Sequence, residues 1–157
     1  MQTETAVTFQ EESAKDCFAE ALPLLHAHWE EVANYKDIPL QPDYETYEAL
    51  HEMGKLKTYT ARDLFGKLIG YFVAFVSYHP HHKNSLQANL DIIFILPQFR
   101  GGTGKRFIAW CENKLRESGV QVVYQHLKIK HDKESLMLRL GYEPIDRVYG
   151  KRLDLGE

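Results

Sequence analysis

The feature that most constrains this fold is an apolar run, Leu90 to Leu96 (LDIIFIL), that stops at Pro97 and leads into a glycine-rich turn, RGGTGK, at residues 100–105. A short apolar segment ended by proline is typical of a buried central strand. The residues after the turn have helical periodicity. Successive amides at a helix N-terminus can point at one anion, and the helix dipole adds about half a positive charge there. The segment therefore predicts a phosphate-binding turn. A tight turn that uses glycine only for its positive φ is the alternative.

The rest of the chain predicts alternating strands and helices. We expect a helix behind Ser13, and Gly119 should cap the helix that follows the turn, whose apolar face is Phe107, Ile108, Cys111 and Leu115. Residues 79–84 read as a His-rich linker. Strands are expected at 6–9, 57–62, 68–78, 90–96, 120–129 and 147–153, a loop with a short helix at 29–47, and a short helix at 132–140.

Size and charge limit the classes of protein. The 157 residues suit one domain, 1–157. A net charge of -3 argues against a nucleic-acid partner. No stretch approaches the length of about 18 apolar residues that spans a membrane, so we expect no membrane partner and a cytoplasmic protein. Cys17 and Cys111 lie in helical patterns without CxxC spacing and are expected to be buried free thiols.

The histidines do not form a convincing metal site. His79, His81 and His82 cluster, and His26 and His28 form a pair. Pro80 makes the first cluster a turn, and no HExxH motif or cysteine partner accompanies either group. We therefore expect no bound metal.

Two segments carry a family resemblance. The run IIFILPQFRGGTGKRFIAW resembles the acetyl-CoA signature of the GNAT superfamily of N-acetyltransferases, and SLMLRLGYEPIDRVYGKRL resembles the end of the same fold. The resemblance implies an α/β (α+β) fold. Its sheet would be mixed and mostly antiparallel, with flanking helices and acetyl-CoA at splayed central strands. HWEE at 28–31, LQPDYETY at 40–47, and His82 followed by Asp91 resemble small acetyltransferase-like proteins of bacteriophages. That likeness would place the protein in a host cytoplasm.

The resemblance also implies a cofactor site. Backbone groups of one strand end would contact the pantetheine of acetyl-CoA: Phe94, Ile95 and Leu96. The amides of the turn would hold its pyrophosphate: Arg100, Gly101, Gly102, Thr103, Gly104 and Lys105.

The reaction requires removal of a proton from an amine and protonation of a departing thiolate. Asp91 is the only acidic residue in its apolar strand, and the resemblance implies that it is the base, with a structural aspartate as the alternative. A turn between strands could bring His82 beside Asp91 to relay the proton, although an exposed loop histidine is the alternative. Met137 stands where many relatives have a tyrosine that acts as general acid.

The acceptor side is expected near the end of the first helices. Trp29, Glu30 and Glu31 would border the groove there, where a carboxylate could hold a cationic acceptor; a solvated helix face with one buried tryptophan is the alternative. The chain is therefore interpreted as an N-acetyltransferase for a primary amine of a small molecule or protein. A homodimer is compatible with this interpretation. The alternative is a catalytically weak or inactive binding protein, such as a phage accessory or host-interaction factor.

Overall fold

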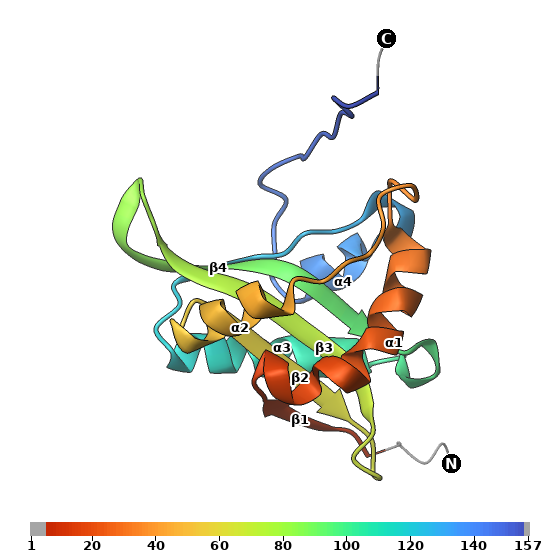
Figure 1. The fold of residues 1–157 in the computed structure, drawn as a ribbon. Helices are drawn as coiled ribbons and strands as arrows, with labels where there is room; N and C mark the ends of the chain where they lie inside the picture. Colours follow the sequence, from red (N-terminus) through yellow and green to blue (C-terminus); the bar gives the residue numbers. More distant parts are fainter. Residues whose placement is uncertain (1–5, 156–157) are drawn as a thin grey trace.

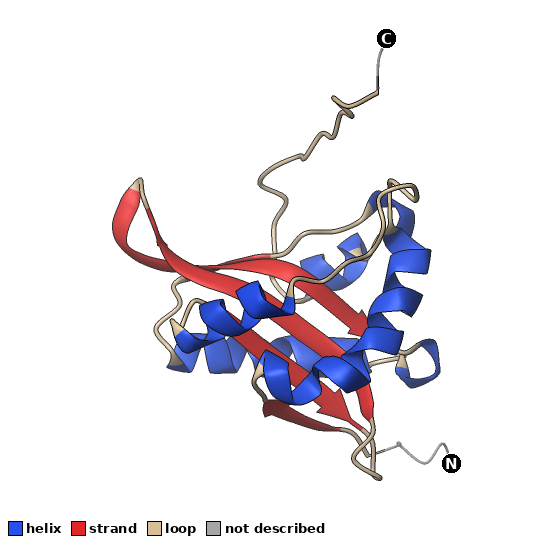
Figure 2. Ribbon diagram, in the orientation of Figure 1, coloured by secondary structure: helices blue, strands red, loops and turns tan. Residues whose placement is uncertain are grey.

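The computed structural model describes residues 6–155 and contains one five-stranded sheet with helices on both faces (Figures 1 and 2). The strands are β1 (Thr8–Glu11), β2 (Leu56–Arg62), β3 (Leu68–His79), β4 (His82–Ile95) and β5 (Val122–Tyr124). The helices are α1 (Ala14–Val32), α2 (Tyr44–Glu52), α3 (Thr103–Glu117) and α4 (Glu134–Arg139), with short 3-10 turns η1 (Pro97–Phe99) and η2 (Ile129–His131). None of the helices among the described residues is long and apolar enough to cross a membrane.

The sheet has the order β1-β2-β3-β4-β5. Neighbouring strands are antiparallel up to β4, and β4 and β5 are parallel. The predicted mixed, mostly antiparallel sheet is therefore confirmed.

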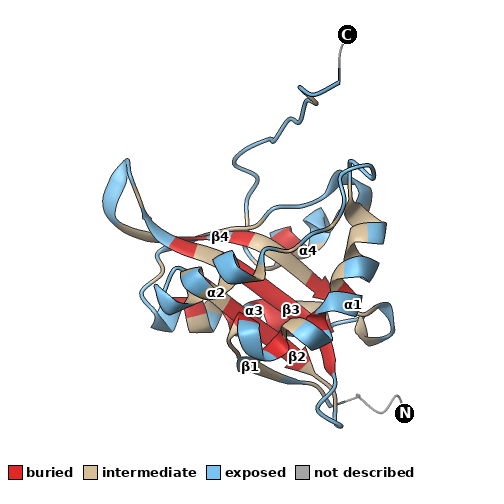
Figure 3. Cartoon of the chain, viewed as in Figure 1, coloured by how far each residue is buried: buried red, intermediate tan, exposed pale blue. Residues whose placement is uncertain are grey.

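Two apolar clusters fix the helices to the sheet. On one face, Leu24 of α1 packs with Tyr71 and Val73 of β3, and α2 lies beside α1. On the other face, Phe107 of α3 packs against Phe72 in a cluster that also holds Cys111 and Leu115. The predicted core face of α3 is confirmed. Figure 3 shows the central strands as the most buried part of the chain.

The ends of the long helices follow their sequence signals. The Ser13 side chain accepts a hydrogen bond from the amide of Asp16 and begins α1. Gly119, with φ +90°, follows α3, and the amide of Val120 donates to the carbonyl of Leu115 as in a Schellman motif. The prediction of Gly119 as the cap is confirmed. Helix α1 continues to Val32, although a loop was predicted from Trp29.

The predicted His-rich linker is instead a hairpin. β3 runs through His79 and β4 begins at His82, so only Pro80 and His81 form the turn. The two strands extend beyond the body of the sheet (Figure 1). The polar residues His82, Lys83 and Asn84 suggested a linker. They are exposed on this arm, so this part of the strand needs no apolar side chains.

The C-terminal strands differ most from the prediction. The expected strand at 120–129 is limited to Val122–Tyr124, and the expected strand at 147–153 does not form. Val148, Tyr149 and Leu153 are 82%, 85% and 86% exposed, and the segment leaves the body of the molecule (Figure 1). A strand requires a partner for its backbone hydrogen bonds, and this segment pairs with no strand among the described residues.

Candidate active site

A cleft opens where β4 and β5 separate. The two strands pair only at Gln87–Val122, Ala88–Val123 and Asn89–Tyr124, so the outer edge of β4 is unpaired from Leu90 onward. The cleft has a volume of about 1280 Å³ and is lined by α1, the α1–α2 loop (residues 33–43), β4, the start of α3 and the segment 125–139.

Alternate residues of β4 direct their backbone N–H and C=O groups toward β3 or toward this cleft. The amide of Leu96 donates to the carbonyl of Ile69 at 2.9 Å, and the carbonyl of Leu96 accepts from the amide of Phe99. Because residues alternate along an antiparallel ladder, Phe94 also directs its backbone groups toward β3, whereas Ile93 and Ile95 direct theirs toward the cleft. The predicted backbone contacts from Phe94 and Leu96 are therefore wrong, and Ile93 was missed.

The turn before α3 presents a row of free donors. Gly101 and Gly102 have φ of +104° and +103°, and the first bond of the helix runs from the amide of Arg106 to the carbonyl of Gly102. Within residues 6–155, no acceptor is assigned to the five amides of Gly101, Gly102, Thr103, Gly104 and Lys105. Such a row at a helix N-terminus is an anion-binding arrangement.

Arg100 differs from the other turn residues. Its amide donates to the carbonyl of Pro97, so the predicted phosphate contact from this amide is wrong. Its side chain instead joins β4 to α1. Nε donates to the carbonyl of Ile95 at 2.8 Å, and Nη2 donates to the two carboxylate oxygens of Glu31 at 3.2 and 3.1 Å.

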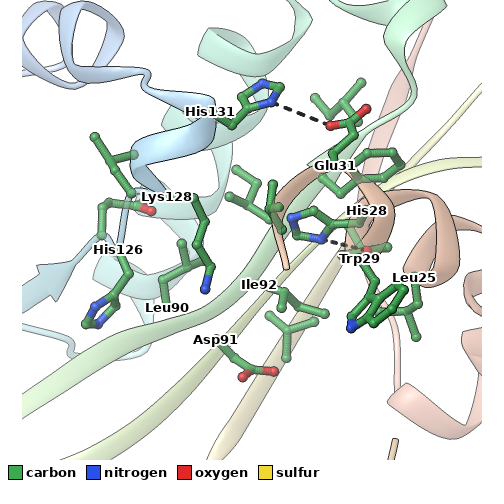
Figure 4. A pocket seen from close by; sticks show the side chains of 18 of the residues that line it. Leu25, His28, Trp29, Glu31, Leu90, Asp91, Ile92, His126, Lys128 and His131 are labelled. Atoms are coloured by element: carbon green, nitrogen blue, oxygen red, sulfur yellow. Dashed lines mark hydrogen bonds and ion pairs between the residues drawn. The ribbon is translucent and has the colours of Figure 1, made fainter. Parts of the chain in front are cut away.

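Glu31 lines the cleft, but its charge is already compensated. Besides Arg100, His131 places Nδ1 3.6 Å from a Glu31 carboxylate oxygen (Figure 4). Trp29 also lines the cleft, and the Lys36 ammonium lies 4.3 Å from its ring centroid. Glu30 pairs with Lys36 at 3.3 Å and does not line the cleft, so its predicted place at the groove is wrong.

Asp91 occupies a β-bulge. Val73 pairs with Ile92 and Ala74 with Leu90, so Asp91 has no partner on β3. Its side chain lines the cleft and accepts a hydrogen bond of 2.6 Å from the hydroxyl of Tyr47 on α2. Burial raises the pKa of Asp91, while the bond from Tyr47 lowers it. Burial and the neighbouring Asp91 raise the pKa of Tyr47, which therefore remains a donor. Sequence reasoning missed Tyr47, since nothing links α2 to β4 along the chain.

His82 is far from Asp91. The two residues lie nine positions apart on the same strand, or about 30 Å at 3.3 Å per residue. The predicted proximity is wrong because β4 begins at His82, so no turn brings His82 back toward Asp91. His82 packs against His79 instead, with ring centroids 5.5 Å apart. Within residues 6–155, no group of three or more His, Cys, Asp or Glu side chains is placed to hold a metal.

Three further side chains, His28, Met137 and Lys128, line the cleft. His28 places Nδ1 3.1 Å from the Tyr71 hydroxyl and stacks on Phe94. Burial lowers the pKa of His28 to about 4, so the ring is neutral at pH 7. Met137 of α4 also lines the cleft and offers no proton there. In Figure 4 the ammonium end of Lys128 points toward β4 on the side of Asp91.

Comparison with known proteins identifies this architecture. An aminoglycoside acetyltransferase from an uncultured soil metagenomic sample, crystallised with sisomicin, matches with a TM-score of 0.68 and 20% identity over 96% of this chain and 97% of its own. A protein from Clostridium acetobutylicum described as a predicted acetyltransferase and crystallised with acetyl-CoA matches with a TM-score of 0.71 and 12% identity, over 94% of this chain and 97% of its own.

Sequence comparison gives a shorter match. The aminoalkylphosphonate N-acetyltransferase of Salmonella typhimurium is 29% identical over 80 residues, 50% of this chain. The chain matches about half the length of this relative (51%). No protein-family profile matches the chain. Its five-stranded, mostly antiparallel sheet with flanking helices nevertheless has the fold of the GNAT acetyltransferases.

Proposed function

We propose that this chain is an acetyl-CoA-dependent N-acetyltransferase that acetylates a primary amine. The observation that carries the proposal is the combination, in one cleft, of five free amides at the start of α3, an unpaired edge of β4 and a buried carboxylate, Asp91. The GNAT fold, seen with acetyl-CoA in the Clostridium protein, supports the same assignment.

The residues of the cleft fit the parts of acetyl-CoA. The amides from Gly101 to Lys105 would hold the pyrophosphate, with the Lys105 side chain on the same side of the cleft. The amide and carbonyl of Ile93 and the amide of Ile95 would form hydrogen bonds along the amide-bearing pantetheine arm, as another strand would, while the carbonyl of Ile95 accepts from Arg100 Nε. The thioester supplies the acetyl group for transfer.

The chemistry of the residues follows from Asp91. The amine nitrogen forms a bond to the thioester carbonyl carbon, the carbon–sulfur bond breaks, and one proton of the amine passes to Asp91, directly or through water. A raised pKa makes Asp91 a stronger base than an exposed aspartate. The hydroxyl of Tyr47 holds the carboxylate in place, and the departing thiolate takes its proton from water because Met137 offers none.

The acceptor should carry an anionic group beside its amine. Lys128 takes part in none of the ion pairs among residues 6–155. Burial is the main cause of the lowered pKa of His28, and the charge of Lys128 adds to it. Glu31, the carboxylate predicted to attract a cation, is occupied by Arg100. The name of the Salmonella relative, an aminoalkylphosphonate N-acetyltransferase, combines an amine with an anion in the same way. The likeness to phage proteins stays a prediction.

Mass spectrometry on a panel of amines tests the proposal. The panel should contain aminoalkylphosphonates, amino acids, polyamines and aminoglycosides, each incubated with acetyl-CoA and the wild-type chain or Asp91→Asn. We expect an N-acetyl product with the wild type. Asp91→Asn should bind acetyl-CoA normally and lose about a hundredfold or more in turnover, with partial rescue at high pH where the amine is already free.

Two outcomes would contradict parts of this proposal. Tight acetyl-CoA binding without acetylation of any amine would favour the binding-protein alternative. Wild-type turnover in a folded Asp91→Asn protein would remove the base assignment.

A further inference from the structure

The cleft continues from Asp91 into an apolar branch between α1 and the sheet. The branch adjoins Asp91 because Val73 pairs with Ile92, the next residue on β4, and Phe75 stacks on the ring of Tyr47. Its lining comes from α1, β2 and β3 and carries no charge among the described residues: Ala14, Cys17, Ala21, Thr58, Val73 and Phe75. Because burial of an unpaired charge is costly, a charged group of a ligand would stay outside the branch and an apolar group would enter it.

Small side chains on α1 create the space of the branch. Ala14, Cys17 and Ala21 follow the spacing of one helix face and are only 3%, 4% and 7% exposed. Because their side chains are short, they leave room between the helix and strands β2 and β3. The whole cleft, at about 1280 Å³, is larger than the roughly 300–1,000 Å³ of an ordinary ligand pocket.

A buried hydroxyl in the branch lacks a hydrogen-bond partner. Thr58 is 3% exposed, and its Oγ1 atom forms no hydrogen bond with any residue among 6–155. Thr58 lies opposite Val73 and, like Leu56 two residues earlier on β2, faces α1. An unpaired buried hydroxyl is costly, so a polar atom of a ligand at this point would gain a hydrogen bond.

A positive charge lies on the other side of Asp91. In Figure 4 the ammonium of Lys128 lies on one side of the Asp91 carboxylate, and Leu25 and Trp29 lie on the other. Leu25 belongs to the same apolar cluster as Ala21 and Val73. An amine held at Asp91 would therefore have a cation on one side, suited to an anionic group, and the apolar branch on the other.

We propose that the acceptor is an α-amino acid whose aromatic side chain ends in a hydroxyl, as in L-tyrosine, and that this side chain occupies the branch. The inference rests on the proposed function and specifies the substrate of the same site. The amine lies at Asp91, the carboxylate is directed toward Lys128, and the hydroxyl pairs with Thr58. β2 is two strands away from β4, or about 10 Å at roughly 4.8 Å per strand, and an aromatic side chain with its polar end spans this distance.

Calorimetric titration in the presence of CoA, which has no acetyl group to transfer, measures this recognition without the reaction. The wild type should bind L-tyrosine about tenfold to a hundredfold more tightly than L-alanine, because burial of a large apolar side chain contributes that much. Ala21→Leu, which fills the branch, should remove most of this preference. The matched control, Ala27→Leu, places the same side chain on the exposed face of α1 and should retain the preference.

Thr58→Val tests the hydroxyl contact with almost no change of shape. The variant should raise the Tm of the free protein, because an unpaired buried hydroxyl is removed. It should lower the affinity for L-tyrosine about tenfold and leave the affinity for L-phenylalanine unchanged or higher. An unchanged ratio of the two affinities would overturn the pairing with Thr58.

The same titrations separate this inference from the proposed function. Equal affinity of the wild type for L-alanine and L-tyrosine would overturn the apolar subsite even where acetylation of another amine is observed. A preference for L-tyrosine that Ala21→Leu removes, without acetylation by acetyl-CoA, would support the subsite and contradict the proposed function.

Discussion

Gly104 offers a sharp test of the anion site because its replacement should separate affinity from stability. It is the second residue of α3, has no positive φ, and a Cβ built on it lies 4.0 Å from Ile95 Cδ1, an ordinary contact. Gly104→Ala should therefore fold normally and even gain up to about 1 kcal/mol of stability from helix propensity. The new methyl group faces the cleft beside the free amides. Loss of one charge-assisted hydrogen bond, about 1.5–3 kcal/mol, lowers acetyl-CoA affinity roughly ten- to hundredfold.

The assay combines calorimetric titration with acetyl-CoA and thermal unfolding of the free protein. The matched control is Gly119→Ala at the other end of α3, where φ is +90° and the cleft is absent. That variant should lose about 1 kcal/mol or more of stability and keep its affinity for acetyl-CoA. Unchanged affinity in a folded Gly104→Ala protein would refute the placement of the pyrophosphate at this turn.

Three further variants test the rest of the cleft. Tyr47→Phe removes the hydrogen bond that lowers the pKa of Asp91, so the acidic limb of the kcat/KM profile should move to higher pH and turnover at pH 7 should fall about tenfold. Arg100→Ala removes the guanidinium from the Glu31 carboxylate and leaves only His131 beside it, so kcat/KM for cationic amines should rise relative to that for anionic amines. His28 titrates near pH 4 when folded and near 6.5 when unfolded, so its contribution to stability is lost as the pH falls between these values. His28→Phe should weaken that pH dependence in urea unfolding measured at pH 7 and 4.5.

Local signals in the sequence were enough to predict the turn and the helix after it. Pro97, the consecutive glycines and the apolar face of α3 affect the conformation of residues close to them in the sequence. They can therefore be interpreted without knowledge of the tertiary structure. Asp91 was found because it interrupts an apolar run. Its identity as a bulge residue was not predictable, since a bulge depends on the register between two strands.

The missed features depend on contacts between distant segments. Tyr47 and Asp91 are 44 positions apart, and Glu31 and Arg100 are 69 apart. The backbone N–H and C=O groups of Ile93 face the cleft because of the register between β4 and β3, whatever side chain stands at this position. The C-terminal segment was predicted as a strand because its composition is that of a strand, but composition does not decide where a segment docks, and this one pairs with no strand among residues 6–155.

One irregularity of the backbone accounts for both the cleft and its base. The last pairing between β4 and β5 is Asn89 with Tyr124, and the bulge at Asp91 follows two residues later. A bulge bends its strand and increases its local twist, so β4 turns away from the direction that β5 had matched. The separation of β4 from β5 therefore begins at the bulge, and the same bulge directs the Asp91 side chain into the cleft between the two strands. If an insertion or deletion restored regular pairing between β3 and β4 at this point, Asp91 would leave the cleft and the cleft would narrow with it.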